Sequence, residues 1–263
     1  MALVVCPECG GKLSDKAEYC PHCGCPSKLI HEDVLNEWII DDAGCLVKYN
    51  GKEHIVEIPE GVVSIGRGAF RESDVVSVII PNGVTSIGIS AFSSCASLRN
   101  ITIPNSVNGI ASGAFRNCES LTEILLPENI VVIGDWAFEG CCALVNVTIP
   151  KTVMTIGTDA FTNCSSLETI TIPDNITTIY PFTFFGCASL KNVIISDSVI
   201  GIGSHAFGEC TSLTTITLPG CSIEKDTFEG CKALKTVYFH DDLWRSLHDE
   251  CFKPSVTLLV RSD

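Results

Sequence analysis

The hydrophobic pattern of this chain changes period within a unit of about 23 residues, and the unit then repeats. Residues 98–104, LRNITIP, are a typical start, because Leu98, Ile101 and Ile103 are apolar while Asn100 and Thr102 are polar. An alternation of this length that ends in proline, which has no N–H to donate, predicts a short half-buried strand. The rest of the unit, VxxIGxxAFxxC, has apolar residues at uneven intervals and predicts an arc of tight turns leading to the next strand.

One phenylalanine in each unit keeps this step along most of the chain. A coil of this length cannot bury its own apolar side chains, so the coils must stack, and their strands then pair in parallel at ~4.8 Å per coil. Side chains one unit apart are therefore expected to lie one above the other. The repeated residues are Phe70, Phe92, Phe115, Phe138, Phe161, Phe184, Phe207, Phe228 and Phe252.

The segments on either side of the repeats have different patterns, as the two open ends of a stack require. Residues 37–59, EWIIDDAGCLVKYNGKEHIVEIP, alternate on both sides of DDAG and predict a hairpin that covers the first coil. Residues 240–260 predict a polar helical stretch, then Pro254 and a last apolar strand. Trp38 and Trp244 are predicted to be core residues of the two caps.

Four cysteines near the start form two CPxCG turns, with Cys6 and Cys9 in the first and Cys20 and Cys23 in the second. Four thiolates that meet tetrahedrally suit a structural Zn²⁺ at ~2.3 Å per Zn–S contact, with no open position for catalysis. Metal binding in so short a segment also supplies folding free energy. The pattern resembles the zinc-ribbon family. Iron in a rubredoxin-like site and a redox dithiol are the alternatives.

The repeated unit, close to LxxIxIPxxVxxIGxxAFxxCxx, resembles the BspA-like leucine-rich repeat over about residues 45–260. The resemblance implies a right-handed leucine-rich repeat solenoid with a parallel sheet on one face. We therefore expect a mainly β protein with three parts. These are a zinc ribbon at 1–28, a linker and N-terminal cap hairpin at 29–54, and the solenoid with its C-terminal cap at 55–263.

A column of cysteines follows the repeated phenylalanines at an offset of three residues. A disulfide ladder, a metal array or a row of nucleophiles is conceivable, since neighbouring coils bring Cα atoms within bridging range. The odd number, and a zinc site that needs reduced thiols, argue against bridging. We favour small buried side chains whose weakly hydrogen-bonding sulfurs fill a corner of the coil. The column is Cys95, Cys118, Cys141, Cys164, Cys187, Cys210 and Cys231.

Outward positions of the predicted strands vary from coil to coil, and in a repeat protein such positions carry recognition. They offer hydroxyls and amides with isolated apolar anchors, a surface that suits a protein or glycan partner. The alternative is that threonine and isoleucine are simply good strand residues on a solvated sheet. The candidate partner-binding residues are Asn100, Thr102, Glu123, Leu125, Asn146, Thr148, Thr169, Thr171, Asn192 and Ile194.

Charge and motifs argue against several classes of function. The net charge of −14, with 17 Lys and Arg against 31 Asp and Glu and no basic run, argues against nucleic acid or anionic lipid as a partner. The six histidines are scattered, and none shares a local sequence motif with a nucleophile and an orienting carboxylate. The glycines follow the coil period rather than a phosphate-binding loop. We therefore expect no enzymatic activity.

The expected location is cytoplasmic. The first residues lack the apolar core of a secretory signal, no stretch reaches the roughly 20 apolar residues of a membrane span, and sixteen cysteines suit a reducing compartment. However, the BspA-like resemblance implies a cell-surface adhesion or host-interaction protein as an alternative. A third hypothesis is a cytoplasmic regulator whose ribbon docks on a nucleic-acid-processing machine. The oligomeric state is left open.

Overall fold

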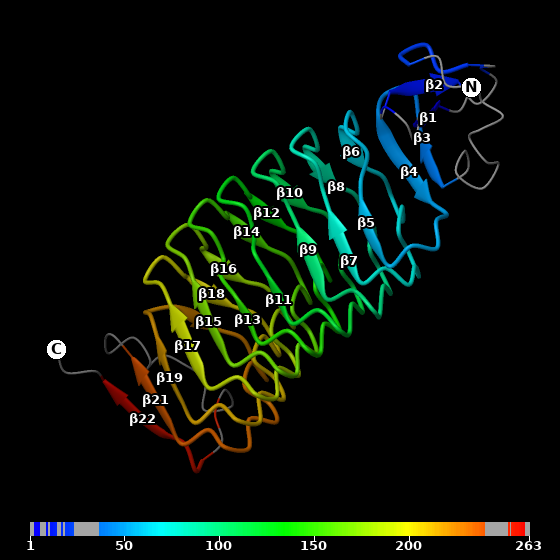
Figure 1. Ribbon diagram of the computed structural model, residues 1–263. Coiled ribbons are helices and arrows are strands. Elements are labelled where there is room, and N and C mark those ends of the chain that lie inside the picture. Colours follow the sequence, from blue (N-terminus) through cyan, green and yellow to red (C-terminus); the bar gives the residue numbers. More distant parts are fainter. Residues whose placement is uncertain are drawn as a thin grey trace.

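The structure, a computed structural model, describes residues 3–5, 9, 11–14, 17, 19–23, 37–239, 252 and 254–260. These residues form an elongated stack of about nine coils (Figure 1), built from short strands and turns, and none of them is helical. The predicted mainly β solenoid with parallel strands is confirmed. The predicted helical stretch of the C-terminal cap, including Trp244, lies outside the described residues.

The alternating segment at the start of each unit forms a strand, and we call the set of these strands the first ladder. Its strands pair in parallel with a register of one unit, as in Asn146↔Thr169↔Asn192. Inward residues such as Val147 and Ile170 are buried, whereas outward residues are exposed or half-buried. The strands are β5 (Ile55–Glu57), β7 (Ser77–Ile79), β9 (Asn100–Thr102), β11 (Glu123–Ile124), β13 (Asn146–Val147), β15 (Thr169–Ile172), β17 (Asn192–Ile195), β19 (Thr215–Leu218), β21 (Thr236–Phe239) and β22 (Thr257–Val260).

A second set of parallel strands, the second ladder, lies in the part of the unit for which only turns were predicted. Each strand has two residues, of which the isoleucine is buried, and a period cannot be recognised in so short a segment. The prediction of an arc made of turns alone was therefore wrong. The strands are β6 (Ser64–Ile65), β8 (Ser86–Ile87), β10 (Gly109–Ile110), β12 (Val132–Ile133), β14 (Thr155–Ile156), β16 (Thr178–Ile179), β18 (Gly201–Ile202) and β20 (Ser222–Ile223).

An antiparallel hairpin of β3 (Trp38–Ile40) and β4 (Cys45–Tyr49) precedes the first coil, as predicted. The backbone N–H groups of Ala43 and Cys45 donate to Asp41 Oδ1 and fix the turn between the strands. Strand β4 pairs in parallel with β6, so the hairpin extends the second ladder at its N-terminal end. A second hairpin, β1 (Leu3–Val5) and β2 (Lys12–Ser14), continues the sheet because β1 pairs with β3.

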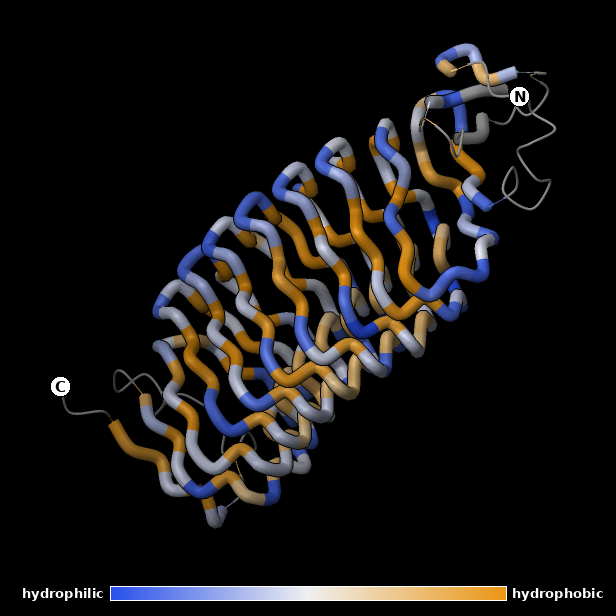
Figure 2. The backbone as a smooth tube through the Cα atoms, in the orientation of Figure 1, coloured by the Kyte–Doolittle hydropathy of each residue, from blue (hydrophilic) through white to orange (hydrophobic). Residues whose placement is uncertain are grey.

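The core is a set of columns that run along the stack. Rings of successive phenylalanines from Phe70 to Phe252 stack with centroids 4.8 to 5.7 Å apart. Apolar and polar residues form stripes that pass from coil to coil (Figure 2). The expectation that side chains one unit apart lie one above the other is confirmed. At the N-terminal end the Trp38 and Tyr49 rings, 4.6 Å apart, continue the aromatic column.

Each coil turns sharply on both sides of its phenylalanine, where the backbone is left-handed. Two residues after the phenylalanine, φ is +74° at Gly140, +60° at Asn163 and +54° at Glu209. Two residues before it, φ is +54° at Trp136. Between these corners the N–H of each repeated phenylalanine from Phe70 to Phe207 donates to a carbonyl of the next coil, as Phe138 does to Ala160 at 2.8 Å. The buried backbone of the corner is thereby satisfied.

Candidate functional site

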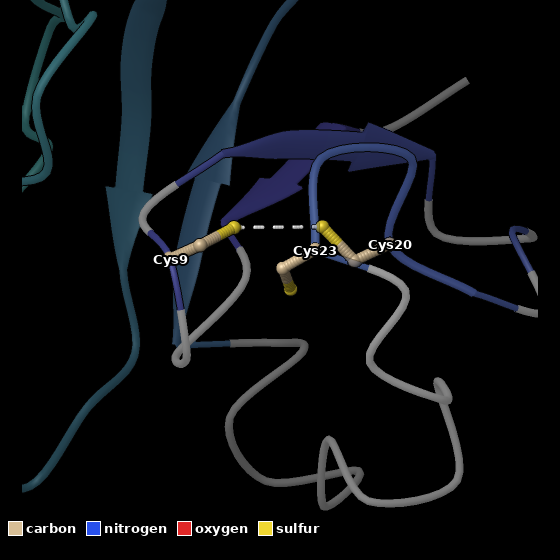
Figure 3. Close-up of side chains that lie close together, drawn as sticks. All are labelled: Cys9, Cys20 and Cys23. Carbon is tan, nitrogen blue, oxygen red and sulfur yellow. Dashed lines mark hydrogen bonds between the residues drawn. The ribbon is translucent and has the colours of Figure 1, made fainter.

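Three of the four predicted metal ligands lie together beside the β1–β2 hairpin. The sulfurs of Cys9, Cys20 and Cys23 are all within 4.8 Å of one another, and Cys9 Sγ lies 3.6 Å from Cys20 Sγ (Figure 3). Cys20 is buried, whereas Cys9 and Cys23 are exposed. Cys6, the fourth predicted ligand, lies outside the described residues.

The donor set of this cluster fits a thiolate-bound metal. Sulfurs on a tetrahedral ion at ~2.3 Å are about 3.8 Å apart, close to the Cys9–Cys20 separation. Burial acts to raise the pKa of Cys20, but hydrogen bonds from the backbone N–H groups of His22 and Cys23 and from the Cys9 and Cys23 thiols lower it to about 6. Cys20 is therefore favoured as a thiolate at neutral pH, the form that binds metal.

The ten candidate partner-binding residues lie on one exposed surface, the outer face of the first ladder. One column contains Asn100, Glu123, Asn146, Thr169 and Asn192, and all five are exposed. The neighbouring column contains Thr102, Leu125, Thr148, Thr171 and Ile194, which are exposed as well.

A hollow of about 700 Å³ lies on this face over β13 and β15. Side chains of both columns line it, together with charged residues beyond the strand ends and buried residues beneath. Thr148 and Thr171 lie in the middle of the hollow. Leu125 and Ile194, on the coils to either side of these threonines, are 80% and 62% exposed. Candidate residues that line the hollow are Asn146, Thr148, Thr169, Thr171 and Ile194, and its charged lining residues are Glu128, Lys151 and Asp174.

The cysteine column is buried and consists of thiols, as the packing interpretation predicts. Each sulfur donates to a phenylalanine carbonyl of the preceding coil, as Cys118 does to Phe92 at 3.2 Å and Cys141 to Phe115 at 3.1 Å. Burial raises the pKa of Cys141 to about 12, so the neutral thiol is strongly favoured. The seven members are thiols in this fold and form no disulfide ladder.

Ser204, His205 and Glu229 form a chain of hydrogen bonds that sequence reasoning missed. The Ser204 hydroxyl lies 2.7 Å from His205 Nδ1, and His205 Nε2 lies 2.8 Å from Glu229 Oε2. A nucleophile, a base and a carboxylate therefore meet at His205 in the fold. The signal was that Glu229 follows Phe228, the repeated phenylalanine of the next coil, which places it on the coil beside His205.

The surroundings of this chain do not favour acyl transfer. The Ser204 N–H donates to Glu224 Oε2 at 2.8 Å, which places negative charge where an oxyanion needs hydrogen-bond donors. The His205 ring stacks on Phe182 with centroids 4.9 Å apart. We interpret these contacts as structural interactions that hold neighbouring coils together.

Comparison with known families gives one match. A family model described as the BspA type leucine-rich repeat region, with six copies, matches residues 48–168 and 132–259. The match begins after the cysteine cluster. No curated protein matches the chain.

Solved structures share the solenoid. A leucine-rich repeat protein of T. pallidum (TpLRR) is 27% identical, with 81% of this chain and 91% of that chain covered and a TM-score of 0.60. A leucine-rich repeat protein of Bacteroides ovatus is 26% identical, with 82% and 73% covered and a TM-score of 0.54. One from Eubacterium ventriosum, 23% identical with 78% and 62% covered and a TM-score of 0.52, shows the fold alone.

Within the described part of the chain, no helix is long and apolar enough to cross a membrane.

Proposed function

Because this chain belongs to the BspA-type leucine-rich repeat family, we propose that it is a non-enzymatic recognition scaffold that binds a macromolecular partner on the outer face of its first ladder. One observation carries the proposal. The hollow of about 700 Å³ lies on the outer face of the first ladder, where outward residues change along the stack from Glu123 and Leu125 to Asn192 and Ile194, whereas the repeated phenylalanines and cysteines are buried in the core. Positions that build the fold and positions available to a partner are thus separated.

The hollow and the exposed residues beside it favour a protein partner over a glycan. Leu125 and Ile194 are three coils apart, about 14 Å at ~4.8 Å per coil, and offer apolar contacts at two points. The hydroxyls of Thr148 and Thr171 lie between them on the intervening coils. The described residues that line the hollow include no aromatic ring on which a sugar could stack. Apolar anchors within a polar surround are typical of protein interfaces.

Affinity capture from a lysate with a charged variant tests this proposal. The variant Thr148→Glu/Thr171→Glu places two carboxylates in the hollow, and we expect loss of a partner that wild type captures reproducibly. The matched control, Thr85→Glu/Thr177→Glu, changes two exposed threonines outside the first ladder and should retain the partner. A partner list that is the same for all three proteins would exclude this face. A glycan partner would be indicated if periodate treatment of the lysate abolished capture.

For the cysteine cluster we propose a structural Zn²⁺ held by Cys6, Cys9, Cys20 and Cys23. The ion would supply a cross-link between the two CPxCG turns and no reaction, because four protein ligands leave no position for substrate. Metal analysis of protein purified without added metal should find about one zinc per chain. The Cys23→Ser variant should lose it, whereas Cys142→Ser, at an exposed thiol of the solenoid, should keep it. Iron in place of zinc would identify a rubredoxin-like site.

We propose a cytoplasmic location for this chain, with the cell surface as the alternative. The seven members of the cysteine column are packed in the core as thiols. Oxidising compartments favour disulfides, whereas the members of this column donate hydrogen bonds as thiols, as Cys118 and Cys141 do. Labelling of intact cells with a membrane-impermeant amine reagent separates the two locations. Labelled protein would place the solenoid on the surface.

A further inference from the structure

The hairpin beside the cysteine cluster belongs to the same sheet as the solenoid. The strand order β14-β12-β10-β8-β6-β4-β3-β1-β2 is continuous, so the second ladder runs through the cap hairpin into β1 and β2. The link is the antiparallel pairing of β1 with β3 at Leu3↔Ile40. Ile40 is fully buried and Trp38 packs against the solenoid core. The β1–β2 hairpin therefore covers the edge that β3 would otherwise expose.

Lys12 of β2 makes a second contact with the solenoid. Its Nζ donates to the carbonyl oxygen of Gly61, at 2.9 Å, in the turn that leads into the first coil. Gly44 and Gly61 have φ of +79° and +86°, and a Cβ added at either would lie 3.3 to 3.4 Å from a Lys12 atom. The lysine thus lies across two glycine turns, one in the cap hairpin and one in the first coil.

A two-stranded hairpin is marginally stable alone, and an uncovered edge strand exposes unpaired backbone groups. Cys9 lies in the connection between β1 and β2, and its sulfur is within 4.8 Å of the sulfurs of Cys20 and Cys23. An ion bound by these thiolates would fix the connection and therefore the hairpin. Because the unfolded segment offers no formed site, binding free energy becomes stability of the hairpin.

We infer that the β1–β2 hairpin is the terminal cap of the second ladder and that metal binding at the cysteine cluster holds this cap on β3. Metal binding then stabilises β3, β4 and the first coil as well as the ribbon itself. This inference rests on the metal site proposed above and is independent of the partner-binding face.

Hydrogen exchange of the full-length protein, with and without zinc, tests the linkage. A ligand that binds only the closed hairpin, at about 100 times its Kd, lowers the open population by about 100-fold. We therefore expect exchange of amides in β3 and β4 to slow by up to that factor on addition of zinc. Amides in β15 and β17, far along the stack, should not change and serve as the internal reference.

Two variants separate docking from metal binding. Lys12→Ala removes the contact with Gly61 but no cysteine, so it should bind one zinc while losing most of the protection in β3 and β4. Lys48→Ala, which changes an exposed lysine of β4, should behave as wild type. The inference is overturned if wild type binds one zinc with no change in β3 and β4, or if Lys12→Ala keeps full protection. Absence of zinc binding would overturn the metal site and the linkage together.

Discussion

The strongest quantitative prediction concerns two adjacent phenylalanines, of which only one belongs to the stacked column. Phe184 is fully buried, and its ring stacks on Phe161 and Phe207, each with a centroid distance of 5.5 Å. Phe185 is half-buried near the surface and contacts Phe182 edge-on at 5.6 Å. Residue type, coil and neighbouring backbone are nearly matched, so the pair isolates the contribution of the column.

Truncation of a buried phenylalanine to alanine costs about 3–5 kcal/mol, and each ring pair adds about 0.5–1.5 kcal/mol beyond area burial. With two partners lost, we expect Phe184→Ala to lower the free energy of unfolding by about 5 kcal/mol. Phe185→Ala should lower it by about 1 kcal/mol, because most of its contacts are at the surface. The difference of about 4 kcal/mol is a large share of the total stability of a typical domain.

Urea unfolding followed by circular dichroism measures both values. With an m-value of about 3 kcal/mol/M, the midpoint should fall by about 1.7 M for Phe184→Ala and by about 0.3 M for Phe185→Ala. Equal m-values for the three proteins are needed for this comparison, since stacked coils can unfold in stages. Equal shifts for the two variants would refute the argument, because they would mean that the column carries no more stability than a surface ring.

Three further predictions concern the cysteine column and the left-handed corners. In the native protein, iodoacetamide should modify exposed Cys142 but not its buried neighbour Cys141, and modified Cys141 in peptide mass spectra would contradict the packing. The pKa of Cys141 and of Cys187 is raised to about 12 from 9.0, so their contribution to stability is complete below about pH 9 and is lost as pH rises towards 12. The urea midpoint should therefore decrease over this range, and a constant midpoint would show that the thiols titrate normally. Glu209→Gly should raise stability by about 1 kcal/mol, because φ is +54° there and the equivalent residues of neighbouring coils are Gly186 and Gly230, whereas Glu168→Gly in an extended segment should lower it.

Repetition made most of the solenoid predictable. A strand of three or four residues carries a weak signal, but the same signal occurs in every unit, so the first ladder and the phenylalanine column could be placed by register. The second ladder could not, because two residues such as Ser86 and Ile87 have no recognisable period. The left-handed corners were also beyond prediction, since Gly140, Asn163 and Trp136 all occupy them.

The candidate sites also differ in how far the sequence predicts them. The cysteine cluster was predictable because the CPxCG spacing itself encodes the turn that brings two sulfurs together. The contacts Leu3↔Ile40 and Lys12–Gly61 occur once, between segments with no shared pattern, so nothing in the sequence indicated how the ribbon docks. The adjacency of Ser204 and His205 was visible in the sequence, but Glu229 meets them only because the next coil stacks on theirs.

A nearly constant coil length also bears on how such a chain can gain or lose sequence. Removal of residues 144–166, one complete unit, would bring Phe138 against Phe184 and leave every remaining column intact. A unit one or two residues shorter also stacks, since the rings of Phe70 and Phe92, 22 residues apart, and of Phe207 and Phe228, 21 residues apart, have centroid distances of 4.8 and 5.7 Å. Duplication or excision of whole units therefore gives a shorter or longer protein with the same interior, and the number of recognition positions changes in proportion.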